Sequence, residues 1–226
     1  MAKSLFGQVI DPWVVQARDI DPQQYFGVTT ANGMIGLVSS EEPMQVQDVV
    51  LNGVYDYYQR GRVSNILKTF NHLNLDLEVD GQMVSRSNIT DYRQELDMRT
   101  ATLTTRFRVS DKLEVTQRLL ALRHLPYTAL SIVKVEALQE VTIAPRSVIV
   151  SPDHLRDPKN YYAEIVRPHV RIPLLTSVAQ SPSGRIKVAA SNSFLFQEPE
   201  GKEPRVTHID WDYNRHWATF SKTLAA

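Results

Sequence analysis

The chain has 226 residues, and its 25 Lys and Arg residues balance its 25 Asp and Glu residues, so the formal net charge is zero. A neutral chain has no electrostatic reason to bind nucleic acid or an anionic membrane surface. The absence of cysteine excludes thiol catalysis, disulfides and cysteine-based zinc sites. The apolar runs are too short to cross a bilayer. We therefore expect neither nucleic acid nor a membrane as a partner.

The ends of the chain bear on its localisation and completeness. The N-terminus lacks the apolar core and small-residue cleavage site of a signal peptide. We expect a cytoplasmic protein, or a periplasmic one whose leader has been removed. Residues 216–226 have the pattern of a strand that stops without a closing turn, which indicates a piece of a longer protein. No internal repeat or linker interrupts residues 1–226, so a single domain is predicted.

In chain order, the first predicted elements are strands. An irregular opening with Asp-Pro pairs leads to strands at residues 25–28 and 34–38, joined by the Asn32-Gly33 turn of a hairpin. Residues 46–50 are predicted to form a strand. Residues 53–61, rich in Tyr and Arg, are predicted to form a loop.

Residues 73–79 alternate apolar and polar side chains without a miss. This predicts a strand with one buried and one wet face, and Asp80-Gly81 then turns the chain. On the same reasoning, Asn74 is expected on the wet face.

The rest of the chain repeats this pattern in short units. Strands are predicted at 92–99, 103–109, 113–119, 127–135, 141–143 and 185–190. Pro145 argues for an edge or a strand end, and Pro168 and Pro173 make residues 166–175 at best an edge strand. No helical stretch of convincing length appears. Many short strands with regular turn signals predict an all-β antiparallel sandwich or barrel.

The sequence contains no assembled catalytic motif. It lacks the glycine-rich nucleotide loops, the zinc-protease helix motif and the serine-hydrolase elbow. Its six histidines are spread singly, so no metal and no cofactor is expected. Sugar hydrolysis needs a pair of carboxylates, or one acid with an external nucleophile, and nothing in the sequence pairs the candidates. These are Asp56, Glu95, Asp97, Asp153 and Asp157.

The aromatic residues form a better candidate site. Flat aromatic faces can stack on sugar rings, and neighbouring polar groups can bind the hydroxyls, although buried packing is the competing explanation. Tyr57 and Tyr58 are adjacent, so in an extended segment only one of them needs to be buried. The candidate carbohydrate contacts are Trp13, Tyr55, Asp56, Tyr57, Tyr58 and Arg60.

Several segments together resemble the N-terminal domain of glycoside hydrolase family 65, which contains maltose, trehalose and kojibiose phosphorylases and related hydrolases. The resemblance covers roughly residues 25–190. It rests on Ala-Asn-Gly-Met-Ile-Gly at 31–36, Leu-Asn-Gly-Val-Tyr-Asp at 51–56, the strand at 70–81, Tyr-Arg-Gln-Glu-Leu-Asp-Met-Arg at 92–99 and the strand at 184–190. Ala31 replaces the first glycine of the family's turn, and residues 71–73 depart from its pattern.

This resemblance implies a galactose-mutarotase-like super-sandwich. It also implies that the general acid lies in a following helical barrel, so no catalytic residue carries over and this chain alone should be inactive. The implied partners are an α-linked glucoside, the chain's own downstream catalytic domain and a second copy in a homodimer; the choice between phosphorolysis and hydrolysis stays open. Two alternatives stand beside this reading. One is a free carbohydrate-binding module that uses Tyr57, Tyr58 and Trp13, and the other is an aldose epimerase that uses a His and a carboxylate on the same fold.

Overall fold

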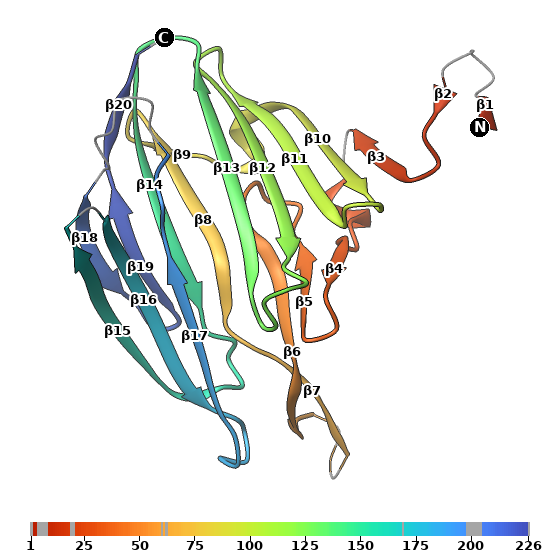
Figure 1. Cartoon of the computed structure of the whole chain (residues 1–226), viewed down its shortest axis with the longest axis vertical. Coiled ribbons are helices and arrows are strands. Elements are labelled where there is room, and N and C mark those ends of the chain that lie inside the picture. Colours follow the sequence, from red (N-terminus) through yellow and green to blue (C-terminus); the bar gives the residue numbers. More distant parts are fainter. Residues whose placement is uncertain are drawn as a thin grey trace.

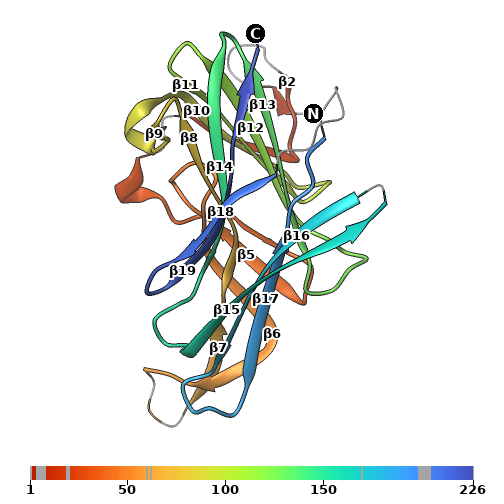
Figure 2. The same ribbon diagram turned by 90° about the vertical axis from the view of Figure 1, so that its left-hand side faces the viewer.

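A computed structural model describes residues 2–3, 9–18, 21–59, 61, 63–168, 170–197 and 205–225. The described chain is built from antiparallel strands, with two single turns of 3-10 helix, η1 (Pro22–Gln24) and η2 (Arg86–Asn88), in the described ranges. Figures 1 and 2 show the strands stacked into twisted sheets that face one another. The all-β antiparallel super-sandwich predicted from the sequence is confirmed.

The described strands form four larger sheets and one two-stranded pair. Sheet I has the order β13-β12-β11-β10-β3, with β3 (Val14–Arg18), β10 (Ile89–Asp97), β11 (Thr102–Val109), β12 (Leu113–Ala121) and β13 (Ala129–Ala137). Sheet II has the order β18-β19-β14-β8-β9, with β20 also on β14; its strands are β8 (Asn71–Val79), β9 (Gln82–Met83), β14 (Val141–Val150), β18 (Val206–Trp211), β19 (Arg215–Phe220) and β20 (Lys222–Leu224).

Sheet III has the order β15-β16-β17, with β15 (Arg156–Arg167), β16 (Val170–Gln180) and β17 (Lys187–Ser193). Sheet IV has the order β4-β5-β6-β7, with β4 (Thr29–Ala31), β5 (Ile35–Ser39), β6 (Val46–Tyr57) and β7 (Ser64–Lys68). Near the N-terminus β1 (Ala2–Lys3) pairs with β2 (Val9–Ile10).

Three apolar clusters hold the sheets together. The first joins sheets I and II through residues such as Phe107 and Leu77. The second joins sheets II and III to the base of the β6–β7 hairpin, and Phe70 and Phe220 lie within it. The third joins sheets I and IV. Because apolar burial is the main favourable term in folding, these clusters fix how the sheets stack and where their loops point.

The period-2 pattern and its turns are confirmed along most of the chain. Strands β11 and β12 alternate buried and exposed residues as predicted, and the turn at residues 110–112 joins them. The β8–β9 turn carries Asp80 and Gly81 at φ +48° and +81°, as the Asp-Gly pair predicts. Residues 25–28, by contrast, form no strand, and the first hairpin of sheet IV is instead β4 with β5.

The predicted wet face of residues 73–79 is wrong at Asn74. Strand β8 pairs with β14 along its length and with β9 only at residues 78–79, and Asn74 is buried where β6 of sheet IV meets β8. Its Oδ1 accepts a hydrogen bond of 2.8 Å from the N–H of Val46, and the neighbouring Asn71 donates to the Val46 carbonyl. These asparagines satisfy the backbone of β6, since a buried peptide group without a partner is costly.

The proline predictions are also wrong at two strands. Strand β14 runs through Pro145 and lies between β8 and β19. Pro145 falls where β14 changes partner on one side, from β20 at residues 141–143 to β19 at residues 146–150. Pro173 lies in β16, the middle strand of sheet III, but β17 pairs only from Leu174 onward. Each proline, which has no N–H to donate, therefore lies next to a break in the pairing of its strand with one neighbour.

Among the described glycines, Gly27 has the least room for a side chain. Its φ is +72°, and a Cβ added there would lie 2.5 Å from Val38 Cγ1 and 2.7 Å from the Ser39 carbonyl oxygen. We expect Gly27→Ala to lower the free energy of unfolding by about 2 kcal/mol, because it combines backbone strain with overlap against backbone. Urea unfolding followed by circular dichroism measures the change.

Gly33 provides the control for this prediction. Its φ is +89°, but an added Cβ would meet nothing within 4 Å. Gly33→Ala should therefore cost only the backbone strain, about 1 kcal/mol. Equal losses for the two variants would show that overlap at Gly27 does not matter.

No helix in the described residues is long and apolar enough to cross a membrane.

Candidate functional site

The tyrosines predicted to contact sugar lie on the β6–β7 hairpin, which extends from the lower end of the molecule in Figure 1. The prediction of a loop at residues 53–61 is wrong for its first half, since β6 continues to Tyr57. Gly53, at φ +98°, lies where the pairing of β6 with β7 shifts register. The glycine thus marks a β-bulge inside a long strand.

Tyr55 and Tyr57 share the outward face of this hairpin. Their side chains are 47% and 39% exposed, and alternation along β6 turns Val54 and Asp56 to the buried side. Tyr55 is directly opposite Ile66, which is also exposed. We call Tyr55, Tyr57 and Ile66 the tyrosine face. It presents flat apolar surface with hydroxyl groups, a combination suited to a sugar ring or to a protein partner.

Other loops meet the tyrosine face. The guanidinium of Arg185, between β16 and β17, lies 5.3 Å from the ring centroid of Tyr57, within the range of a cation–π contact. The Tyr55 hydroxyl donates to Asn52 Oδ1 at 3.4 Å, and the Tyr127 hydroxyl donates to the Asn52 carbonyl at 3.2 Å. Three connections distant in sequence therefore build this end of the molecule.

Asp56 is not available to a ligand. Its side chain is only 3% exposed, and its Oδ2 accepts hydrogen bonds from the Ser183 N–H at 2.9 Å and the Ser183 hydroxyl at 2.6 Å. Its Oδ1 accepts from the N–H of Tyr57 at 2.8 Å. The carboxylate fastens the β6–β7 hairpin to the β16–β17 turn.

The electrostatics of Asp56 agree with this anchoring role. Burial on its own raises the pKa of a carboxyl, but hydrogen bonds from the Ser181 and Ser183 hydroxyls and from the N–H groups of Ser183 and Tyr57 outweigh it. Together they hold the pKa of Asp56 well below its usual range. A carboxyl ionised at all ordinary pH values cannot donate a proton to a leaving group.

Tyr58 is placed in a different environment from its neighbours. It is half-buried and packs against the second apolar cluster, with its ring centroid 4.6 Å from that of His154. The Nε2 of His154 donates to the Lys68 carbonyl at 2.8 Å. Tyr58 therefore packs inward against His154 and this apolar cluster, and Arg60 lies outside the described residues.

Trp13 is not brought to the tyrosine face. It precedes β3 in sheet I, and Figure 1 shows β3 well apart from the β6–β7 hairpin. Trp13 is exposed, and Arg99 lies 6.0 Å from its ring centroid. Arg99 donates two hydrogen bonds to Asp11, at 2.6 and 2.8 Å, and so lowers the pKa of that carboxyl.

The groups that could transfer protons are dispersed. His208 and Asp210 are in contact at 3.4 Å, but both are exposed on the edge strand β18. Burial lowers the pKa of His72 and of His216, which keeps both rings neutral within sheet II. In the described part of the chain no three His, Asp or Glu side chains converge on a metal position. None of these arrangements forms an enclosed acid–base pair.

Sequence reasoning missed the residues that complete this end of the molecule, namely Ser181, Ser183, Arg185 and Tyr127. The Ser-Pro-Ser-Gly segment at 181–184 is recognisable as a turn. Nothing in the local sequence, however, indicates that its hydroxyls bind a carboxylate 127 positions earlier.

The chain matches a known domain family over most of its length. The family model "Glycosyl hydrolase family 65, N-terminal domain" matches residues 27–216. Over 216 residues the chain is 49% identical to a kojibiose hydrolase of Mucilaginibacter mallensis and 43% identical to a kojibiose hydrolase of Flavobacterium johnsoniae. Each alignment covers 96% of this chain and 32% of the relative, so the chain spans about a third of their length.

The fold also matches a solved structure. A putative kojibiose phosphorylase from human microbiome superposes with a TM-score of 0.67 at 10% identity, over 96% of this chain and 31% of that one. At this identity the match supports the fold alone.

Proposed function

Since this chain belongs to the glycosyl hydrolase family 65 N-terminal domains, we propose that it is the non-catalytic β-sandwich domain of a longer enzyme that cleaves an α-linked glucoside. In this proposal residues 1–226 form one domain, which supports a downstream catalytic domain. The reaction is hydrolysis, and the substrate class is that of kojibiose, because both hydrolases compared above carry that name.

The coverage of the alignments is the main support for this proposal. The chain aligns along nearly its whole length with only about a third of each relative. Both carboxylate oxygens of Asp56 already accept hydrogen bonds from the protein. Among the described residues no acid and base enclose a ligand position. Both observations are in keeping with catalysis in another part of the longer enzyme.

The activity test compares two proteins. The longer protein is expected to release glucose from kojibiose without added phosphate, and the 226-residue chain is expected to release none. Glucose release by the 226-residue chain alone would overturn the non-catalytic assignment. A strict requirement for phosphate in the longer protein would replace hydrolysis by phosphorolysis.

Within this proposal the tyrosine face contacts the catalytic domain beside the sugar site. We expect the double variant Tyr55→Ala/Tyr57→Ala to lower kcat/KM of the longer protein about tenfold, since central aromatic residues dominate interfaces. The free energy of unfolding of the 226-residue chain should change by no more than about 1 kcal/mol, because both side chains are partly exposed and lose only the contacts with Asn52 and Arg185. Steady-state kinetics and urea unfolding measure the two effects.

Tyr213 provides the matched control. It is exposed between β18 and β19 and has no ring contact or side-chain hydrogen bond in the described structure, so Tyr213→Ala should leave kcat/KM unchanged. If the double variant behaves like Tyr213→Ala, the tyrosine face is not part of the working enzyme.

A free carbohydrate-binding module is the second candidate, and the exposure of Tyr55 and Tyr57 is the observation that favours it. Calorimetric titration of the 226-residue chain with kojibiose separates the two functions. The supporting domain gives no saturable heat, whereas a binding module gives saturable heat that the double variant abolishes.

We also propose that the longer protein forms a homodimer. Light scattering after size-exclusion chromatography tests this point: a monomeric mass would remove it without affecting the assignment of the domain.

A further inference from the structure

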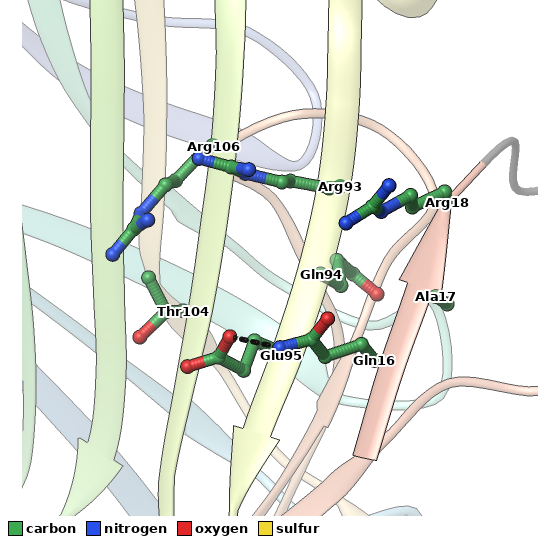
Figure 3. Close-up of a pocket in the computed structure, with 8 residues that line it drawn as sticks. All are labelled: Gln16, Ala17, Arg18, Arg93, Gln94, Glu95, Thr104 and Arg106. Carbon is green, nitrogen blue, oxygen red and sulfur yellow. Dashed lines mark hydrogen bonds between the residues drawn. The ribbon is translucent and has the colours of Figure 1, made fainter. Parts of the chain in front are cut away.

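Three arginines form a row across sheet I, on three neighbouring strands. Arg93 of β10 is directly opposite Arg18 of β3 on one side and directly opposite Arg106 of β11 on the other. Figure 3 shows the three side chains in one row above the strands. Directly opposite residues have Cβ atoms about 5 Å apart, so three positive charges are concentrated in a small area of a chain that is neutral as a whole.

The guanidinium groups of this row lack an ion-pair partner in the described part of the chain. Within the described residues no ion pair or hydrogen bond engages the guanidinium of Arg18, Arg93 or Arg106. Glu95 is the carboxylate that lines the same depression, and its Oε2 accepts a hydrogen bond of 2.7 Å from Gln16 Nε2. Glu95 thus balances at most one of the three charges.

Two other exposed arginines of the chain, by contrast, are paired. Arg108, two residues after Arg106 on β11, forms ion pairs with both Glu114 and Asp91. Arg99 forms an ion pair with Asp11. Like charges directly opposite one another destabilise a sheet. The row therefore opposes the stability of the sheet that carries it, which indicates a use other than holding the fold together.

The row borders a small depression. Its volume is about 110 Å³, and its lining includes Gln16, Glu95 and Thr104 beside the three arginines. Since each water molecule takes up about 30 Å³ in the liquid, the depression holds only a few waters. A small anion fits within it. The Thr104 hydroxyl makes no hydrogen bond within the described part of the chain and is available as a further donor.

We propose that Arg18, Arg93 and Arg106 form a binding site for a phosphate group, either free or carried by a phosphate monoester. The planar guanidinium donates two parallel hydrogen bonds to the oxygens of such a group. A dianion neutralises most of the uncompensated charge of the row. Chloride carries a single charge and has no oxygen atoms that could accept two parallel hydrogen bonds from a guanidinium group. The site lies on sheet I and is independent of the tyrosine face.

Calorimetric titration of the 226-residue chain with inorganic phosphate tests the site, with ionic strength held constant by sodium chloride. We expect saturable binding that Arg93→Gln weakens about tenfold, since charge-assisted hydrogen bonds are among the strong ones. Arg123→Gln is the matched control, because Arg123 is exposed and unpaired in the described structure but lies outside the depression. It should bind phosphate as the unaltered chain does.

Thermal unfolding provides a readout that a purely structural role would not produce. Without phosphate, Arg93→Gln should raise Tm by about 1–2 °C, because it removes a like charge from the middle of the row. At the same concentration, phosphate should raise the Tm of the unaltered chain more than that of the variant. A lower Tm for the ligand-free variant would contradict the like-charge argument.

A parallel titration with glucose 6-phosphate distinguishes the two sources of the group. Tighter binding of the ester than of inorganic phosphate assigns the site to phosphate monoesters, and the reverse assigns it to the free ion. The proposal is overturned if neither ligand gives a saturable response, or if Arg93→Gln and Arg123→Gln bind phosphate equally.

Discussion

Phe220→Ala is expected to lower the free energy of unfolding of the chain by about 4 kcal/mol, within the usual range for a buried aromatic residue. Phe220 is 1% exposed at the end of β19. Its ring centroid lies 5.0 Å from that of Phe194 and 4.9 Å from that of Phe196. The substitution removes apolar contacts and leaves a cavity in the cluster that joins sheets II and III. Urea unfolding followed by tryptophan fluorescence measures the loss.

Phe26→Ala is the matched control for this prediction. Phe26 is 90% exposed, so the same chemical change should alter the free energy of unfolding by less than about 0.5 kcal/mol. A loss below about 2 kcal/mol for Phe220→Ala would show that the cluster collapses around the missing ring.

Asp56→Asn is expected to lower the free energy of unfolding by about 3 kcal/mol at pH 7, although it preserves the shape of the side chain. The new amide group places a donor where Asp56 now accepts from the N–H of Tyr57 or from Ser183. A buried donor is then left without an acceptor. Asp153→Asn is the control, because Asp153 is exposed and its side chain makes no hydrogen bond within the described chain.

The pH dependence of this difference follows from the sign of the pKa shift. The pKa of Asp56 is lower in the folded chain than its ordinary value, so the ionised carboxylate stabilises the fold fully above the unfolded pKa of about 4. This contribution is lost as the pH falls from there toward the folded pKa. The gap between the unaltered chain and Asp56→Asn should therefore be constant from about pH 5 to 7 and shrink below about pH 4. A gap that stays constant down to pH 2 would contradict the anchoring role.

Sequence patterns predicted the strands well wherever one face is buried and the other is wet. In β11 and β12 the period of two is local, so it can be read without knowledge of the partner strand. The Asp80-Gly81 turn is equally local, because its positive φ angles depend on the residue types themselves. Both features follow from steric rules that act within a few residues.

The same reasoning failed where a second element decides the environment. Asn74 has the alternation of a wet face, yet sheet IV covers it and uses its oxygen for the backbone of β6. Gly53 and the tyrosines have loop composition, yet pairing with β7 holds residues up to Tyr57 in a strand. Pro145 and Pro173 suggested edges, yet both lie in interior strands beside interrupted ladders.

The candidate site shows the same division. Tyr55 and Tyr57 could be identified from composition and lie together on one exposed face, whereas Trp13 and Tyr58 lie in other environments. Asp56 could not be recognised as an anchor, because its donors lie 127 positions away. The arginine row was also invisible in sequence, since Arg18, Arg93 and Arg106 become neighbours only through the register of three strands.

The sequence by itself determined the all-β class, the antiparallel turns and the membership of the family, because hydrophobic period, turn chemistry and short motifs are local properties of the chain. The tertiary structure alone decided which polar groups are buried and which charges are neighbours. Those properties depend on strand register and sheet stacking, which join residues far apart in the sequence and carry no local pattern.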